Sequence, residues 1–167
     1  MATDHIDRLT KQWRDLHLAE IDPAPLGVTG RILRIAQHLE QSRVKVLSRW
    51  GLTLGDFDVL ATLRRSASDR GINPRALLAD TMITSGAMTT RLDRLEAAKC
   101  ITRAPDPDDR RGILISLTET GRIVAEQALE AVLREERDLL AALTLADRKR
   151  LATSLRGLVI ACEASTT

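Results

Sequence analysis

Residues 84–118 read TSGAMTTRLDRLEAAKCITRAPDPDDRRGILISLT, and this stretch decides the fold of the 167-residue chain. Its first part predicts a helix, because Met88, Leu92 and Leu95 recur at the spacing of one apolar helix face. The opposite face carries the polar side chains of Thr90 and Arg94. One side of this helix is therefore suited to a core, while the other is a polar outer face.

A β-hairpin is expected directly after this helix. A short strand at 101–104 leads into the polar tip PDPDDRR, and a returning strand covers 112–117. A helix followed by a hairpin with arginines at its tip suits a DNA duplex, because the helix can enter the major groove while the hairpin reaches the backbone or the neighbouring minor groove. The same pattern also fits a plain α+β module with a solvated turn.

Helices are expected on both sides of this stretch, because apolar residues recur there at helical spacing. Asn73 is suited to cap a short helix with Pro74 at its first position, and a tight turn separates that helix from the one beginning near residue 85. Two short helices joined by a turn match a helix-turn-helix. The remaining helices are predicted at residues 4–20, 29–50, 53–66, 118–143 and 144–165.

Composition and charge narrow the possible functions. The chain has 25 Lys and Arg against 23 Asp and Glu, a net charge of +2, so any DNA-binding face must come from how the charges are placed. Two Trp, one Phe and no Tyr argue against an aromatic platform for stacking RNA bases. The length favours one domain with a real core, and no secretory or membrane-spanning run occurs, so we expect a soluble, cytoplasmic protein.

Residues that could carry out catalysis or bind a metal form no recognisable constellation. His5, His17 and His38 are scattered and make no zinc-binding spacing, and neither a nucleophile elbow nor a phosphate-binding loop occurs. Cys100 and Cys162 are far apart and are best interpreted as two reduced thiols. We therefore expect neither an enzyme nor a metal or cofactor site.

Three charged residues are predicted to lie in or near the interior. Asp58 interrupts the apolar segment FDVLA, where a carboxylate is costly unless it is paired. Arg91 lies on the flank of the apolar helix face, and Arg103 shares strand parity with Ile101. From the residues alone, these charges are either a structural ion-pair cluster or part of a ligand site.

The hairpin carries the motif by which the chain resembles a known family. The chain is similar, over nearly its whole length, to MarR-family winged helix-turn-helix regulators. The wing signature of that family, D-x-R-G running into a strand that ends L-T-x-x-G, is matched by Asp109, Arg111, Gly112, Leu117, Thr118 and Gly121. The resemblance implies a mainly α fold of α+β type, with a winged helix-turn-helix over about residues 53–117 inside a single domain, residues 1–167.

The terminal helices carry too many apolar side chains to lie exposed on a small winged core, and such surfaces are usually buried against other protein surface. They could pack within their own chain. In MarR proteins the corresponding helices, here residues 4–28 and 118–165, interlock two subunits, so the resemblance implies a homodimer.

A dimer would present two recognition helices to half-sites about one helical turn apart on a palindromic operator in double-stranded DNA. In the recognition helix, Thr89, Thr90 and Arg94 are our candidates for groove contact. Ser85, at the helix N-terminus, is suited to a phosphate. Arg110 and Arg111 at the wing tip are suited to phosphates and the minor groove.

Within this family, the chain resembles most the urate-responsive subgroup with an extra N-terminal helix. Those proteins use a Trp in that helix, an Asp before the helix-turn-helix, an Arg in the recognition helix and an Arg in the following strand. The matching residues here are Trp13, Asp58, Arg91 and Arg103. The resemblance implies a repressor that urate or a related purine releases from its operator.

Two alternatives remain open for this anionic effector. Two guanidinium groups and an indole would also hold a small polycarboxylate such as aconitate or citrate, because an arginine fork recognises carboxylates as readily as purine oxygens. The chain could also bind DNA with no small-molecule ligand, and its internal charges would then be structural.

Overall fold

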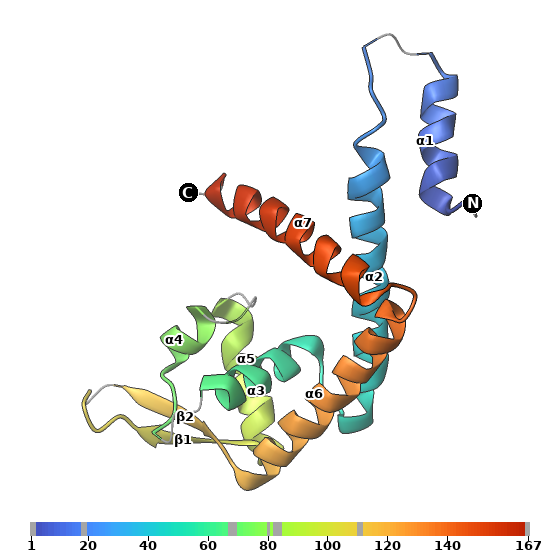
Figure 1. Cartoon of the computed structure of the whole chain (residues 1–167). Coiled ribbons are helices and arrows are strands. Elements are labelled where there is room, and N and C mark those ends of the chain that lie inside the picture. The colour runs from blue at the N-terminus through green and yellow to red at the C-terminus, as the bar shows by residue number, and fades with distance from the viewer. Residues whose placement is uncertain are drawn as a thin grey trace. The chain divides into compact units, whose positions relative to one another are not determined.

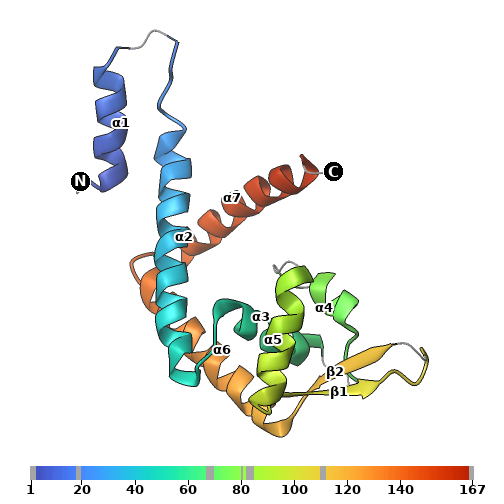
Figure 2. The ribbon, with the colours of Figure 1, turned by 180° about the vertical axis from the view of Figure 1, so that it is seen from behind.

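A computed structural model describes residues 3–17, 20–66, 70–79, 81, 85–109 and 112–165, apart from the side chains of 85–87. The described residues are mostly helical and contain one two-stranded antiparallel sheet (Figure 1 and Figure 2). This arrangement confirms the predicted mainly α fold. The chain divides into two compact units, residues 1–54 and residues 55–167. The expected single domain over residues 1–167 stays a prediction.

The first unit consists of α1 (His5–Asp15), α2 (Leu26–Leu47) and the short 3-10 helix η1 (Ser48–Trp50). A capping box starts α1, because Asp4 accepts from the amide of Asp7 at 2.9 Å while Asp7 accepts from the amide of Asp4 at 3.0 Å. The same two carboxylates bind Arg31 of α2, at 2.8 Å and 2.7 Å. These ion pairs fix α1 beside the first turns of α2.

Both helices of this unit differ in their ends from the sequence expectation. α1 ends at Asp15, five residues early, because His17 adopts a left-handed backbone with φ 50° and its amide closes onto the carbonyl of Arg14. α2 begins at Leu26, directly after Pro25, since a proline is tolerated at a helix start. Gly51 follows η1 with φ 65°, a left-handed conformation that glycine adopts easily, so the helical segment ends at the predicted residue 50.

The second unit follows the expected order of elements. It contains α3 (Leu54–Ser66), α4 (Pro74–Ala79), α5 (Ser85–Ala97), β1 (Ile101–Pro105), β2 (Ile113–Leu117), α6 (Glu119–Leu140) and α7 (Leu145–Ala164). Three of the helices begin at side-chain caps. Asn73 accepts from the amide of Ala76 at 2.8 Å, and Thr118 and Thr144 accept from amides three residues ahead at 2.9 Å and 3.2 Å.

The two strands pair in the register Ile101 opposite Leu117 and Arg103 opposite Ile115. Ile115 is fully buried, and on its other side it exchanges two backbone hydrogen bonds of 2.9 Å with Ile72. Gly71 makes this approach possible. Its φ is 89°, and a Cβ there would lie 2.7 Å from the carbonyl oxygen of Ile115. The sheet is thereby fixed to the segment that leads into α4.

The core of this unit positions α5. Met88, Leu92 and Leu95 are all buried, which confirms the predicted apolar face of that helix. They share the core with buried residues of α3, α4 and both strands, among them Leu60 and Leu77. Full burial of one such side chain contributes about 1.5–3 kcal/mol, so α5 is held mainly by this apolar contact.

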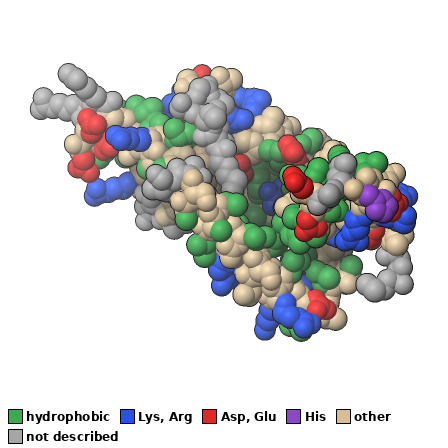
Figure 3. Space-filling view, turned by 90° about the horizontal axis from the view of Figure 1, so that it is seen from above, with side chains coloured by type: hydrophobic (Ala, Val, Ile, Leu, Met, Phe, Trp, Pro, Cys, Tyr) green, Lys and Arg blue, Asp and Glu red, His purple; other side chains and the backbone are tan. Residues whose placement is uncertain are grey.

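In contrast to α5, α7 has no buried residue. Leu151, Leu155 and Leu158 recur at helical spacing along it and are 41%, 37% and 46% exposed. Hydrophobic side chains also lie open on the surface that Figure 3 shows. Among the described residues, no helix is both long enough and apolar enough to cross a lipid bilayer.

Candidate nucleic-acid interface and ligand site

The helix-turn-helix consists of α4 and α5, with α5 as its second helix. The buried side of α5 faces the core, while Thr89 and Thr90 are exposed, as expected for residues that contact a groove. The side chain of Ser85 lies outside the described part of the chain. The geometry of α5 is therefore that of a recognition helix with short hydroxyl side chains open to a partner.

The wing is closed by contacts of its acidic residues. The amide of Asp106 donates to the carbonyl of Gly112 at 3.0 Å, and the amide of Gly112 donates to the carbonyl of Asp109 at 2.8 Å. The carboxylate of Asp106 also accepts from the amide of Asp108 at 2.9 Å. Arg110 and Arg111, the predicted DNA contacts at the tip, lie outside the described residues.

Arg94 has a different environment from the one expected. Its Nη2 atom lies 2.5 Å from both carboxylate oxygens of Asp56, a residue of α3 that is only 1% exposed. The sequence suggested Asp58 as the buried acid and Arg94 as an outward-facing residue. The side chain of Arg94 is still half exposed, but its guanidinium is engaged in fixing α5 to α3. Groove contact by Arg94 accordingly stays an untested prediction.

Arg91 lies on the same side of α5, one turn earlier. Its guanidinium occupies the space that a Cβ would need at Gly55, so the absence of a side chain there admits the arginine to the first turn of α3. Its Nε and Nη1 atoms are buried and have no hydrogen-bond partner among the described residues. The positive end of the α3 dipole lies at this same turn and disfavours a cation. An anion bound at this turn would accept hydrogen bonds from Arg91 and would interact favourably with the helix dipole.

Arg103 projects from β1 toward the C-terminal half of α5. Its Nη2 atom lies 2.7 Å from Asp93 and its Nη1 atom 3.2 Å from Glu96, and its side chain is 26% exposed. Its Nε atom is buried and has no partner among the described residues. Arg103 therefore joins the sheet to the recognition helix through two ion pairs.

The remaining two predicted ligand residues lie on other helices. Asp58 is partly buried in α3, three residues from Gly55 and hence on the same side of that helix. Arg91 is therefore brought to the region of α3 that carries Asp58. Trp13 belongs to α1 in the first unit and is 46% exposed. Its predicted role beside the other three residues stays a prediction.

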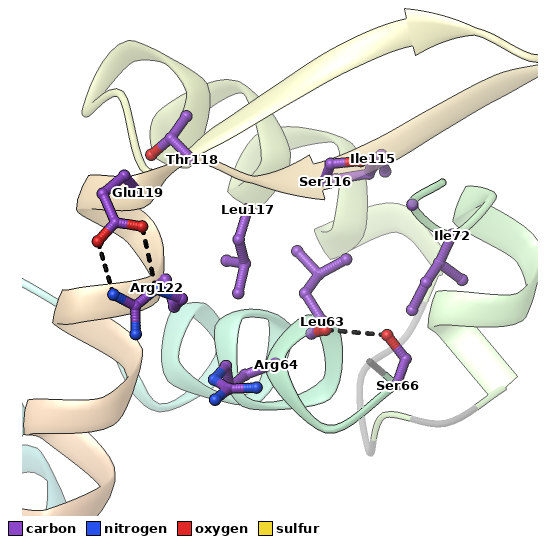
Figure 4. Close-up of a pocket in the computed structure, with 11 residues that line it drawn as sticks. Leu63, Arg64, Ser66, Ile72, Ile115, Ser116, Leu117, Thr118, Glu119 and Arg122 are labelled. Atoms are coloured by element: carbon purple, nitrogen blue, oxygen red, sulfur yellow. Dashed lines mark hydrogen bonds and ion pairs between the residues drawn. The ribbon is translucent and has the colours of Figure 1, made fainter. Parts of the chain in front are cut away.

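A hollow of about 370 Å³ that sequence reasoning missed lies where the end of α3, strand β2 and the start of α6 meet (Figure 4). Arg122 lies at one side of it, 2.6 Å from Glu119, and it also pairs with Glu126 at 3.0 Å. These bonds raise the pKa of Arg122 and lower the pKa of Glu119. The arginine is thus held by acids of its own helix, and none of the predicted site residues lines this hollow.

Neither the cysteines nor the possible metal ligands form a further site in the part of the chain that the structure describes. Cys100 is buried, and this burial raises the pKa of its thiol, while Cys162 is exposed. Within the described ranges, no group of three or more His, Cys, Asp or Glu side chains could hold a metal ion.

Together, α3 to α5, the two-stranded wing and the polar face of α5 define a winged helix-turn-helix protein. A sequence model of the MarR family matches residues 50–112. The HTH-type transcriptional regulator PecS of Dickeya dadantii (strain 3937) is 34% identical over 135 residues, which cover 81% of each chain. The multiple antibiotic resistance protein MarR of Escherichia coli (strain K12) is 33% identical over 104 residues, which are 62% of this chain and 70% of the relative.

The solved structures agree with these relatives. A crystal structure of a mutant MarR from E. coli, complexed with operator DNA, superposes with a TM-score of 0.66 at 25% identity and covers 93% of this chain and 99% of that one. The chain belongs to the MarR family of winged helix-turn-helix regulators.

Proposed function

We propose that this protein is a DNA-binding transcriptional repressor, and that a small anionic effector releases it from a palindromic operator. The observation that carries this proposal is the guanidinium of Arg91. It belongs to the recognition helix, it is partly buried, and two of its nitrogen atoms have no partner among the described residues. A ligand that binds Arg91 would therefore act directly on the helix that contacts DNA.

The energetics of Arg91 favour an anion as the effector. A buried donor without a partner costs about 1–3 kcal/mol, and more when the group is charged. An anionic ligand would remove this cost and would also be stabilised by the N-terminal turn of α3, which Arg91 approaches closely because Gly55 has no side chain. The same ligand would repel the carboxylate of Asp58 on the same side of α3. It would then favour a rearranged state of α5, since a ligand shifts an equilibrium through its different affinities for two states.

Urate, or a related purine such as xanthine, is our first candidate for this effector. The choice rests on the resemblance that assigns Trp13, Asp58, Arg91 and Arg103 to a urate site. A flat, anionic purine suits both an arginine fork and an indole face. A small polycarboxylate such as aconitate or citrate suits the arginines equally well but gains nothing from the indole.

A second candidate function is DNA binding without any small-molecule ligand. It is favoured by Arg103, whose two ion pairs with Asp93 and Glu96 of α5 are already formed. In this case the internal charges serve only to fix the wing against the recognition helix. Arg91 distinguishes the two candidates, because a purely structural arginine would be expected to have acids beside it as Arg103 does.

We also propose that the protein acts as a homodimer. α7 has no buried residue although Leu151, Leu155 and Leu158 lie at one helical spacing along it, and an apolar row of this kind is normally covered by a partner. A second copy of the chain is the partner that operator symmetry requires, because two half-sites need two recognition helices.

The proposal is tested by measuring binding of the full-length protein to DNA from upstream of its own gene, with urate, xanthine, citrate and aconitate titrated separately. We expect a purine to release the DNA and to quench Trp13 fluorescence in a protein with Trp50 replaced. Arg91→Ala should abolish both effects, and Asp58→Asn should retain quenching but reduce release. Arg134→Ala is the matched control, since it removes an exposed arginine that pairs with Glu130, one turn away in α6.

Each outcome of this titration selects one of the candidates. Release by citrate or aconitate alone would replace the purine with a polycarboxylate. DNA binding that no compound alters at millimolar concentration would establish the ligand-free alternative. A protein that binds no DNA from that region more tightly than unrelated DNA would contradict the regulatory function for its own gene.

A further inference from the structure

The outward face of α5 carries an acid besides its two threonines. Asp93 lies one helical turn after Thr89 and three residues after Thr90, so the three side chains share one side of the helix. All three residues are exposed, while Met88 and Leu92 on the other side are buried in the core. A recognition helix contacts base edges with residues at spacings of this kind. Asp93 is therefore placed where bases of the major groove would lie.

The carboxylate of Asp93 is held in one orientation from the neighbouring strand. The Nη2 atom of Arg103 donates to its Oδ1 atom at 2.7 Å, and among the described residues its Oδ2 atom accepts no hydrogen bond. The side chain of Asp93 is 59% exposed, against 26% for that of Arg103. The partly buried guanidinium thus fixes one carboxylate oxygen, and the other oxygen is open to a partner.

The chemistry of a carboxylate limits which base it can contact. An ionised carboxylate only accepts hydrogen bonds, and cytosine presents its N4 amino group as a donor in the major groove. Guanine N7 and O6 and thymine O4 are acceptors that repel a negative charge, and adenine presents an acceptor at N7 beside its amino donor. Cytosine is therefore the base that Asp93 would bind best.

We propose that Asp93 is a specificity-determining residue that reads a cytosine in the bound DNA. Its Oδ2 atom accepts from the N4 amino group of the base, while Arg103 is the positioning residue that holds Oδ1. Because Arg103 compensates part of the negative charge of Asp93, it also reduces the repulsion from the DNA phosphates. The proposal rests on the role of α5 as the recognition helix, and it gives this ion pair a function beyond fixing the sheet to that helix.

The test is selection of binding sites by the full-length protein from a pool of random DNA duplexes, followed by affinity measurements on the selected sequence. We expect one cytosine position that Asp93→Asn converts to adenine, because an asparagine side chain pairs with adenine N6 and N7. The wild type should prefer cytosine over adenine there about ten-fold, the effect of one base contact, and the variant should reverse this preference. Asp93→Ser, which has neither a carboxylate nor an amide, should lose the preference for cytosine without gaining one for adenine.

Glu96→Gln is the matched control. Glu96 binds the same arginine at 3.2 Å but is less exposed than Asp93, so its replacement should weaken the attachment of the sheet to α5 and leave every base preference unchanged. An unchanged preference in both Asp93 variants, or the same change in Glu96→Gln, would overturn the proposal and leave Asp93 as a structural partner of Arg103. A wild type that selects no sequence from the pool would instead refute the proposed regulatory function, and this inference with it.

Discussion

The ion pair between Arg94 and Asp56 gives the most direct test of how α5 is positioned. Arg94→Ala would leave the carboxylate of Asp56, only 1% exposed, without its arginine. A hydrogen bond to a charged group contributes about 1.5–3 kcal/mol. Because the arginine is half exposed, we expect a value near the lower end, about 2 kcal/mol. For a chain of this size, that loss lowers the melting temperature by about 4–8 °C.

Thermal and urea unfolding of the wild type, the two single variants Arg94→Ala and Asp56→Ala, and the double variant would measure this coupling. The double variant should be more stable than the sum of the single changes predicts, by about 1–2 kcal/mol, since it removes both members of the pair. The matched control is Arg134→Ala, which breaks an exposed pair and should change stability by at most about 0.5 kcal/mol. If Arg94→Ala unfolds like the wild type yet loses operator affinity, our reasoning is refuted and Arg94 contacts the groove as the sequence suggested.

Three other predictions concern assembly, DNA and acid. Leu155→Glu should convert a dimer to monomers in sedimentation, because it places a charge in the exposed apolar row of α7; an unchanged dimer would exclude that row as the interface. Arg111→Ala should weaken binding to all DNA sequences alike and flatten the salt dependence by about one counterion, whereas a loss confined to the operator would indicate base contact. Backbone amides and Arg31 hold the pKa values of Asp4 and Asp7 below their ordinary value of 3.8. The stability from these acids is therefore present above pH 3.8 and is lost as pH falls through the lower folded values, and a fall in the melting temperature that begins near pH 6 and disappears in Asp4→Asn and Asp7→Asn would contradict this.

The sequence predicted the elements that depend on local chemistry. Asn73 caps α4 as its position suggested, and Thr118 and Thr144 cap the helices predicted to begin at residues 118 and 144, because an N-cap needs only its own helix. The apolar face of α5 was predicted equally well, since burial follows directly from helical spacing. The end of α1 was not predicted correctly, because the spacing of apolar residues gives no signal for the left-handed backbone of His17.

The environment of the arginines could not be predicted in the same way. The sequence analysis placed Asp58 as the buried acid, but the fully buried carboxylate belongs to Asp56. Asp56 and Asp58 are two residues apart, and the angle at which α3 and α5 cross decides which of them meets Arg94. The sequence pattern of a single helix carries no information on that angle. Gly55 was a usable signal, since a glycine in a helix often marks a close approach by another group.

Arg91 and Arg94 are three residues apart on α5, and both reach the first turn of α3, at Gly55 and at Asp56. Arg94 has a carboxylate as its partner, while two buried nitrogens of Arg91 have no partner among the residues that the structure describes. An anion bound to Arg91 would therefore lie close to Asp56, which holds Arg94. Repulsion between the anion and the carboxylate of Asp56 would weaken the ion pair of Arg94 with Asp56 as the anion binds Arg91. We infer that an effector at Arg91 would weaken the attachment of α5 to α3 at Arg94, while Met88, Leu92 and Leu95 keep the helix anchored in the core by apolar burial.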